Sequence, residues 1–251
     1  MRDDLYADPV LAQFYDRDRP RPDFEYCQNL ARSAGRVLDL GCGTGQLAAA
    51  LAGTRHVVGV DPAAAMLDIA RARPGGGRVC WVQADARNVR LHRQFDLVVL
   101  TGHSFQVLLS DADQSAVLTT IREHLAPNGR FVFDSRNPDF AGRKERDRSD
   151  KLSGFTHPVL GIIEPWNISR YNEDTGILHY TNGYREKATG AEHSASARIR
   201  YSRRDDLAAR IDAVGLFVRE WLEDWTGAAF STRSPEIIPI GQRAAGTQET
   251  S

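Results

Sequence analysis

The chain has 251 residues, of which 41% are hydrophobic and 26% charged, and its formal net charge is -1. These values are ordinary for a globular protein of one sizeable domain, or of one domain with a subdomain. The small net charge and the lack of any apolar run near the ~20 residues of a membrane span argue against nucleic acid and membranes as partners.

Residues 1–34 are predicted to form an N-terminal helical cap. Asp8 and Pro9 are typical of a helix start and begin a short first helix. A link rich in proline and arginine follows at 17–22, and a second helix is predicted over 23–34.

Strands and helices are expected to alternate over residues 35–137. The predicted strands cover residues 36–40, 56–60, 78–83, 95–100 and 130–134. Asp111 is expected to cap the helix before the last strand, and Pro127 to Gly129 to end it. The run 95–100 is almost wholly apolar, which is typical of a strand buried on both faces. The alternation with short links predicts an α/β fold with a doubly wound parallel sheet.

The pattern changes after Arg136, and an insert is predicted over 138–202. Its first part, 138–154, is polar and is expected to be a loop. Period-two patterning then predicts antiparallel strands at 159–164, 166–171, 176–185 and 194–201. Turn residues at 172–176, at 187–192 and around Gly161 fit hairpins, so we expect a small β-sheet that covers the substrate.

Residues 203–242 are expected to complete the core sheet. Ser202 to Asp205 has the pattern of a capping box and would open a helix that Gly215 ends. Two strands are predicted at 217–225 and 236–242. The polar tail 243–251 is expected to be disordered.

The stretch VLDLGCGTGQLA, residues 37–48, predicts a buried strand, a tight turn and a helix start. Its glycines allow strained dihedrals and a close approach of the backbone to a nucleotide-like ligand. Gln46 stands where the third glycine of a dinucleotide fingerprint would fall, and no Lys-Ser/Thr pair of a P-loop follows. Asp61 ends the second strand, where a carboxylate binds the ribose hydroxyls of either NAD or S-adenosylmethionine.

Two later segments bear on the choice of ligand. Asp85 follows the third strand, where its carboxylate and the amide of Ala86 are able to read the edge of an adenine. The segment Thr101-Gly102-His103-Ser104-Phe105 follows the fourth strand. In an open α/β sheet this is the crevice in which the reacting group of a ligand lies.

Together, VLDLGCGTG, the acid in VVGVDPAAAML, the acid in VQADA, and FDLVVLTGHSF resemble the class I S-adenosylmethionine-dependent methyltransferases over residues 23–138. The later SPEIIPIGQR is similar to the C-terminal reversed hairpin of that family. The resemblance implies a Rossmann-like, seven-stranded sheet with an antiparallel last strand, an N-terminal helical cap and an antiparallel β insert after strand five. The layout is loosely similar to the amino-sugar and glycine N-methyltransferases, within the small-molecule branch.

The resemblance also implies residues that contact S-adenosylmethionine. The glycines would lie under the methionine and ribose, Met66 would pack on the adenine, and Asp39 would support the turn or meet the amino group. Tyr15 and either Arg19 or Arg21 would close over the cofactor carboxylate. The full predicted set is Tyr15, Arg21, Asp39, Gly41, Gly43, Gly45, Asp61, Pro62, Met66, Asp85, Ala86, Thr101 and His103.

His103 is the candidate catalytic residue. The resemblance implies an electrophilic methyl group, so the enzyme aligns a nucleophile, and a general base contributes about 10²–10⁴-fold. The unperturbed pKa of an imidazole suits proton transfer near neutral pH. The alternative is that His103 only positions a ligand or a loop. Arg136, Trp166 and Tyr180 are candidate substrate residues, although the two aromatic residues fit the insert's own core equally well.

Two other classes stay open from the residues alone. One is an NAD-dependent oxidoreductase, and the other is a non-catalytic cofactor-binding protein. The resemblance to the small-molecule branch implies a nitrogen or oxygen of a small molecule as the methyl acceptor. The Asn/Asp-Pro-Pro-aromatic motif of enzymes that methylate nucleobase amines or protein amide nitrogens is missing after the fourth strand, which argues against nucleic acid as the substrate. The three cysteines Cys27, Cys42 and Cys80 lack metal-ligand spacing, so no metal is predicted, and a cytoplasmic monomer or homodimer is expected.

Overall fold

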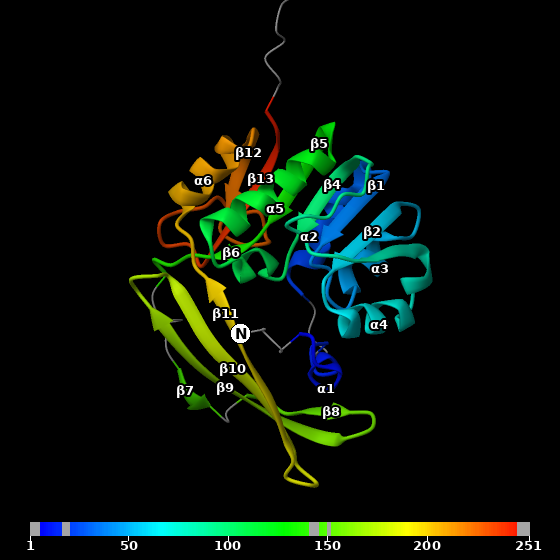
Figure 1. Cartoon of the computed structure of the whole chain (residues 1–251), viewed down its shortest axis with the longest axis vertical. Helices are drawn as coiled ribbons and strands as arrows, with labels where there is room; N and C mark the ends of the chain where they lie inside the picture. The colour runs from blue at the N-terminus through cyan, green and yellow to red at the C-terminus, as the bar shows by residue number, and fades with distance from the viewer. Residues whose placement is uncertain (1–5, 17–20, 141–145, 150–151, 245–251) are drawn as a thin grey trace, which may run out of the picture.

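The structure is a computed structural model that describes residues 6–16, 21–140, 146–149 and 152–244. Part of the expected link, 17–20, and most of the expected tail, 245–251, lie outside these residues. An α/β part occupies the upper half of Figure 1 and a separate antiparallel sheet the lower half, with the short helix α1 (Pro9–Ala12) between them. The division into five segments stays a prediction.

The main sheet confirms the predicted architecture. Its strand order is β12-β13-β5-β4-β1-β2-β3, with parallel pairing from β5 through β3 and antiparallel pairing of β13 with both β5 and β12. A two-residue strand, β6 (Ser135–Arg136), also pairs with β13. The strands are β1 (Arg36–Leu40), β2 (His56–Asp61), β3 (Val79–Gln83), β4 (Phe95–Leu100), β5 (Leu125–Phe133), β12 (Leu216–Leu222) and β13 (Glu236–Arg243).

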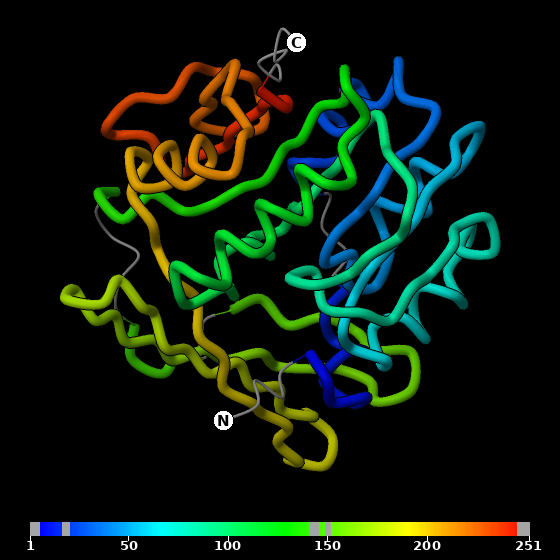
Figure 2. The backbone as a smooth tube through the Cα atoms, turned by 45° about the horizontal axis from the view of Figure 1, so that its top comes forward, coloured from blue at the N-terminus to red at the C-terminus, as the bar shows by residue number. Residues whose placement is uncertain are grey.

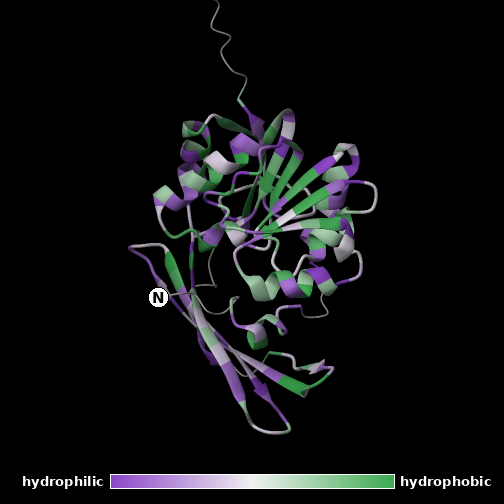
Figure 3. Ribbon diagram, turned by 45° about the vertical axis from the view of Figure 1, so that its right-hand side comes forward, coloured by the Kyte–Doolittle hydropathy of each residue, from purple (hydrophilic) through white to green (hydrophobic). Residues whose placement is uncertain are grey.

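Helices cover both faces of this sheet. Leu118 of α5 and Leu207 of α6 pack in one core cluster, while Cys27 of α2 and Leu47 of α3 pack in another. Figure 3 shows the strands between them as mostly hydrophobic, so both faces are buried. The elements are α2 (Asp23–Leu30), η1 (Ala31–Ser33), α3 (Gln46–Leu51), α4 (Ala64–Ala72), η2 (Gly76–Arg78), η3 (Ser104–Val107), α5 (Asp111–His124) and α6 (Arg204–Ala213). Among the described residues, no helix combines the length and apolar character that crossing a membrane requires.

Three predicted helix signals behave differently in the structure. The N-cap of α5 is Ser110, whose hydroxyl accepts from the Asp113 amide at 3.1 Å, so Asp111 is the first helical residue and not the cap. The capping box at Ser202 is wrong, because that hydroxyl bonds the buried Gln114 amide at 3.1 Å instead. β5 begins at Leu125, before the expected stop, because Leu125 already pairs with Phe95 of β4.

The antiparallel insert is confirmed, with three changes, one of which is a short strand, β8, at residues that no prediction covered. The expected strands 159–164 and 166–171 form one strand, β9, which continues through Pro165 between its pairing segments with β8 and β7. The expected loop 138–154 contains β7. The sheet has the order β11-β10-β9-β7, with β8 beside β9, and consists of β7 (Arg146–Ser149), β8 (Phe155–His157), β9 (Gly161–Asn172), β10 (Ile177–Glu186) and β11 (Glu192–Arg200).

The N-terminal segment packs against the insert. Phe14 is fully buried, and its ring lies 4.6 Å from that of Tyr184 on β10. Leu11 joins the same apolar cluster. Figure 2 shows the blue N-terminal segment along the second sheet, so residues far apart in sequence share one small core. This packing holds the insert opposite the carboxyl ends of the main strands.

Candidate active site

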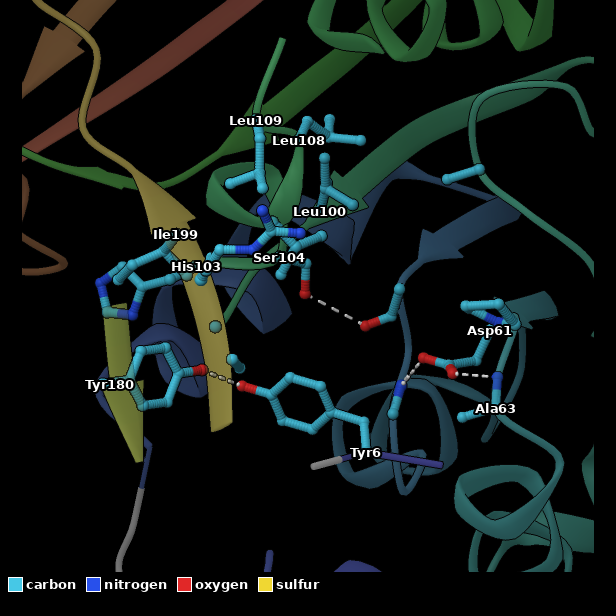
Figure 4. A pocket seen from close by; sticks show the side chains of 18 of the residues that line it. Tyr6, Asp61, Ala63, Leu100, His103, Ser104, Leu108, Leu109, Tyr180 and Ile199 are labelled. Carbon is cyan, nitrogen blue, oxygen red and sulfur yellow. Dashed lines mark hydrogen bonds between the residues drawn. The ribbon is translucent and has the colours of Figure 1, made fainter. Parts of the chain in front are cut away.

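A cavity of about 1250 Å³ lies between the two sheets (Figure 4). One wall is formed at the carboxyl ends of β1, β2 and β4, and the other by β9, β10 and β11. The predicted site residues that line it are Tyr15, Gly41, Gly43, Asp61, Pro62, Met66, Asp85, Ala86, His103, Arg136 and Tyr180. The topology therefore collects most of the predicted cofactor residues around one space.

The glycine loop forms the floor of this cavity. Gly41 and Gly43 have φ of +68° and +54°, values that favour glycine, and the Gly41 amide donates to Val60 at 2.7 Å. A Cβ on Gly43 would lie 3.7 Å from the Tyr15 ring, in the space the loop leaves open. Gly45 does not line the cavity, because a Cβ there would come within 2.4 Å of the Trp81 ring. Gly45 therefore serves packing between helix and strand.

Asp61 ties the loop to the next strand. Its two carboxylate oxygens accept from the Gly43 amide at 2.8 Å and the Ala63 amide at 2.9 Å, as the dashed lines of Figure 4 show. Burial raises the pKa of Asp61, and these two bonds oppose that shift. A second lone pair on each oxygen remains for the hydroxyls of a ribose.

Arg87, which the sequence analysis did not single out, lies beside the predicted adenine-binding residues Asp85 and Ala86. The Arg87 guanidinium bridges Asp85 and Asp113, with N–O distances of 2.6 Å to each. Hydrogen bonds from Arg87 lower the pKa of Asp85, so this carboxylate is ionised and acts only as an acceptor. Met66 is buried beneath the same end of the cavity. Asp85 and Met66 thus line one end of the cavity, with a charged acceptor on one side and an apolar side chain on the other.

Arg21 lies against the turn after β4 and lines a second cavity next to the first, not the first cavity itself. Its guanidinium donates to Asp23 at 2.6 Å and to the Thr101 hydroxyl at 2.9 Å. A Cβ on Gly102 would lie 3.0 Å from Arg21 Nη2, so the glycine permits this approach. Thr101 is buried and does not line the cavity. The alternative residue Arg19 lies outside the described residues.

The segment before Arg21 is also fixed to the loop. Asp16 accepts from the Thr44 hydroxyl at 2.6 Å and pairs with Arg73, which in turn donates to the Thr44 carbonyl at 2.7 Å. These contacts hold Tyr15 over Gly43. No spacing in the sequence predicts these contacts between Asp16, Thr44 and Arg73.

Asp39 lies beneath the loop and does not reach the cavity. It is 3% exposed, and burial raises its pKa from 3.8 to about 7, while Arg21 acts in the opposite direction. A backbone hydrogen bond from Ala48, in α3, is a further interaction. Asp39 was predicted either to support the turn or to meet the amino group of the cofactor, and its burial supports the first role.

The raised pKa of Asp39 predicts a pH-dependent stability. A carboxyl with a higher pKa in the folded state binds more protons when folded, so its contribution is present at low pH and is lost as pH rises from about 4 to about 7. One group contributes at most about 1.4 kcal/mol per pH unit. Urea titrations should show the unfolding free energy of the wild type falling relative to Asp39→Asn across this range. The control is Asp68→Asn, at an exposed position, for which the difference in unfolding free energy from the wild type should not change with pH. The same constant difference for Asp39→Asn would contradict the raised pKa of Asp39.

His103 is held by two carboxylates, Asp134 between β5 and β6 and Glu236 at the start of β13. Its backbone has φ +64°, and its amide donates to Asp134 at 2.9 Å. Its Nε2 lies 3.0 Å from Glu236 Oε2 and 3.7 Å from Asp134 Oδ2. Pairing of β13 with β6 places Glu236 opposite Arg136. No spacing in the sequence connects Glu236 with a histidine 133 positions away.

The inner face of the insert forms the opposite wall. Tyr180 reaches the cavity, where its hydroxyl lies 2.7 Å from that of Tyr6, a residue the sequence reasoning missed. Arg136 also lines the cavity, and its Nη1 donates to Gln106 at 3.3 Å. Trp166 was predicted to contact the substrate, but its side chain lies on the face of β9 that points away from the cavity. The Arg148 guanidinium lies 4.2 Å from its ring there, because alternate side chains of a strand face opposite sides.

Comparison with known proteins assigns the family. Residues 37–129 match a family described as "Methyltransferase domain". The chain is 36% identical over 219 residues to a cypemycin N-terminal methyltransferase of a Streptomyces species, covering 82% of each chain. The CcbJ methyltransferase from Streptomyces caelestis superimposes with a TM-score of 0.79 at 24% identity, covering 97% of this chain and 96% of that one. CalS10, an amino pentose methyltransferase from Micromonospora echinaspora, gives 0.69 at 23% identity, covering 97% and 100%.

Fold, glycine loop and relatives together define a transferase with a Rossmann-like core. The chain belongs to the class I S-adenosylmethionine-dependent methyltransferases. It is an enzyme, and S-adenosylmethionine is its methyl donor. Nothing supports the NAD-dependent or the non-catalytic alternative.

Proposed function

We propose that this enzyme methylates an amine nitrogen of a small molecule, with His103 as the general base. The observation that carries the proposal is the 3.0 Å contact between His103 Nε2 and Glu236 Oε2 at the edge of the cavity. Because a carboxylate only accepts, the neutral imidazole keeps its proton on Nε2, and Nδ1 is the basic nitrogen. Glu236 thereby fixes the tautomer and orients the ring.

The surroundings of His103 favour a cationic acceptor. A second cavity of about 780 Å³ shares Gly102 and His103 with the first. Its charged lining residues are Asp23, Glu25, Asp134, Asp224, Glu236 and a single arginine, Arg21. Carboxylates attract an ammonium and do not assist a neutral hydroxyl in the same way. The 36% identical relative carries the name of an N-terminal methyltransferase, which supports an amine.

The chain offers a suitable site for the donor. Gly41 and Gly43 leave room beneath it, Asp61 would accept from ribose hydroxyls, and Arg21, next to the turn after β4, is the candidate partner of the donor's carboxylate. When bound, the donor supplies a methyl group on a sulfonium, so the acceptor lone pair forms the N–C bond while the S–C electron pair stays on sulfur. Before this transfer, His103 Nδ1 removes a proton from the acceptor ammonium, which frees the lone pair on nitrogen. The insert and the N-terminal segment line the cavity, so a donor bound between them and the glycine loop would be shielded from water.

The test compares amines with alcohols of the same carbon skeleton. With wild-type enzyme and S-adenosylmethionine, mass spectrometry should detect methylated amines. Glu236→Gln should lower the amine rate by about tenfold or more, because the hydrogen bond to His103 then lacks the negative charge that stabilises the protonated imidazole. Glu220→Gln, at an exposed position of β12, is the matched control. Alcohols methylated as fast as the amines would overturn the proposal.

A further inference from the structure

The inner face of the insert presents a pair of side-chain amides to the cavity. Asn167 of β9 and Asn182 of β10 are directly opposite each other in the sheet, and both line the cavity. Asn167 Nδ2 donates to Asn182 Oδ1 at 2.7 Å and to the Thr181 carbonyl at 3.3 Å. Neither residue has a role in the chemistry described above.

These contacts fix which way each amide points. The Thr181 carbonyl only accepts, so the nitrogen of Asn167 must face it, and the oxygen of Asn182 must face that nitrogen. Within the described part of the chain, Asn167 Oδ1 and Asn182 Nδ2 have no protein partner. The wall therefore offers one acceptor and one donor side by side, on a rigid pair of strands.

An extended peptide matches this pair. In antiparallel pairing, one residue exchanges both an N–H and a C=O bond with its neighbour, so both groups leave the chain on the same side. A donor and an acceptor on adjacent side chains meet those two groups together. A sugar hydroxyl both donates and accepts and would not need two groups of fixed opposite character.

The neighbouring rows of the same wall fit a peptide that carries an apolar side chain. Two residues along β10, Tyr180 is opposite Ser169, and two further, Leu178 is opposite Ile199 of β11. Leu178 and Ile199 are apolar and line the cavity. Asn182 and Leu178 are separated by about 13 Å, the length of about four extended residues.

The apolar row lies at the His103 end of the wall. Gln106 of η3, the short helix that His103 caps, donates to the Arg200 carbonyl at 3.0 Å, immediately after Ile199. His103, Ile199 and Tyr180 all line the cavity, and Figure 4 draws them on the side away from Asp61. The wall therefore runs from the base, past an apolar row, to the amide pair.

From this order, and resting on the proposed amine methylation, we propose that the acceptor is a short peptide bound in an extended conformation. Its free amino terminus lies at His103, an apolar side chain packs on Leu178 and Ile199, and a backbone amide further along pairs with Asn167 and Asn182. The asparagine pair is thus a specificity-determining subsite for peptide backbone.

The test uses an unblocked tetrapeptide of leucine and alanine, analogues in which one amide at a time is replaced by an ester, and an amino sugar. We expect the peptide to be methylated on its terminal nitrogen, with kcat/KM about tenfold lower for one ester analogue. Asn182→Leu and Asn182→Asp should each cause a similar loss with the peptide. When either variant is tested with that ester analogue, kcat/KM should be little lower than with one of the two changes alone, as expected for groups in direct contact.

Thr181→Val is the matched control, since Thr181 is adjacent on β10 but bonds Ser196 on the other face. A peptide that is not methylated while the amino sugar is, or equal loss for both acceptors in Asn182→Leu, would overturn the peptide assignment alone. The peptide assignment would also be overturned if the losses in kcat/KM from the ester and from the Asn182 substitution multiply when the two are combined. If no amine of any kind is methylated, the proposed function itself fails.

Discussion

At neutral pH, His103→Ala is expected to lower kcat by about 10²–10⁴-fold with an amine acceptor, the usual contribution of a general base. The affinity for S-adenosylmethionine should stay within about threefold, because the glycine loop and Asp61 do not depend on the imidazole. Single-turnover kinetics and calorimetric titration measure the two quantities separately. The imidazole is about one quarter exposed, at 26%, so its loss should leave the fold intact.

A comparison with His179→Ala controls for the loss of a histidine, because His179 is exposed on β10. The control should retain the wild-type kcat. If His103→Ala keeps the wild-type rate, His103 only positions the turn, through its amide bond to Asp134. If both rate and cofactor affinity collapse, the residue is part of the cofactor site and not the base.

Asp61→Ala should weaken cofactor binding by about 100-fold or more. The change removes the acceptor for two backbone amides and the expected acceptor for the ribose hydroxyls, and each bond to a charged group is worth roughly 1.5–3 kcal/mol. The free energy of unfolding should fall by less than the binding energy, because removing a buried carboxylate also removes its desolvation cost. Calorimetric titration with S-adenosylmethionine and urea unfolding measure the two effects.

Asp68→Ala is the matched control, since Asp68 lies on the exposed side of α4 and pairs only with exposed Arg71 among the described residues. It should change neither quantity measurably, as expected for a surface pair. Asp61→Asn, which keeps one acceptor oxygen, should be intermediate. Wild-type affinity in Asp61→Ala would show that the carboxylate only closes the loop.

The core of the fold was predictable because its signals are local. The strand that ends at Leu40, the glycines after it and Asp61 at the end of β2 lie within one short stretch, and the structure brings them to one cavity wall. The hairpin turns of the insert were predictable for the same reason, since their turn residues lie next to each other in sequence.

The remaining features depend on pairing that no local pattern encodes. Trp166 and Tyr180 have the same character, yet only Tyr180 faces the cavity, because a period of two does not tell which face is covered. Glu236 meets His103 only because β13 runs antiparallel beside β5 and β6. Tyr6 reaches Tyr180 through packing of the N-terminal segment on the insert.

The most direct test of His103 as a base is the pH dependence of the defect in His103→Ala. A base is needed only while the acceptor is an ammonium, and an aliphatic amine becomes neutral near pH 10. Single-turnover rates with one amine acceptor should therefore show a wild-type to variant ratio that falls steadily from about pH 7 to about pH 10 and approaches one. A ratio that stays constant over this range would contradict proton removal by His103.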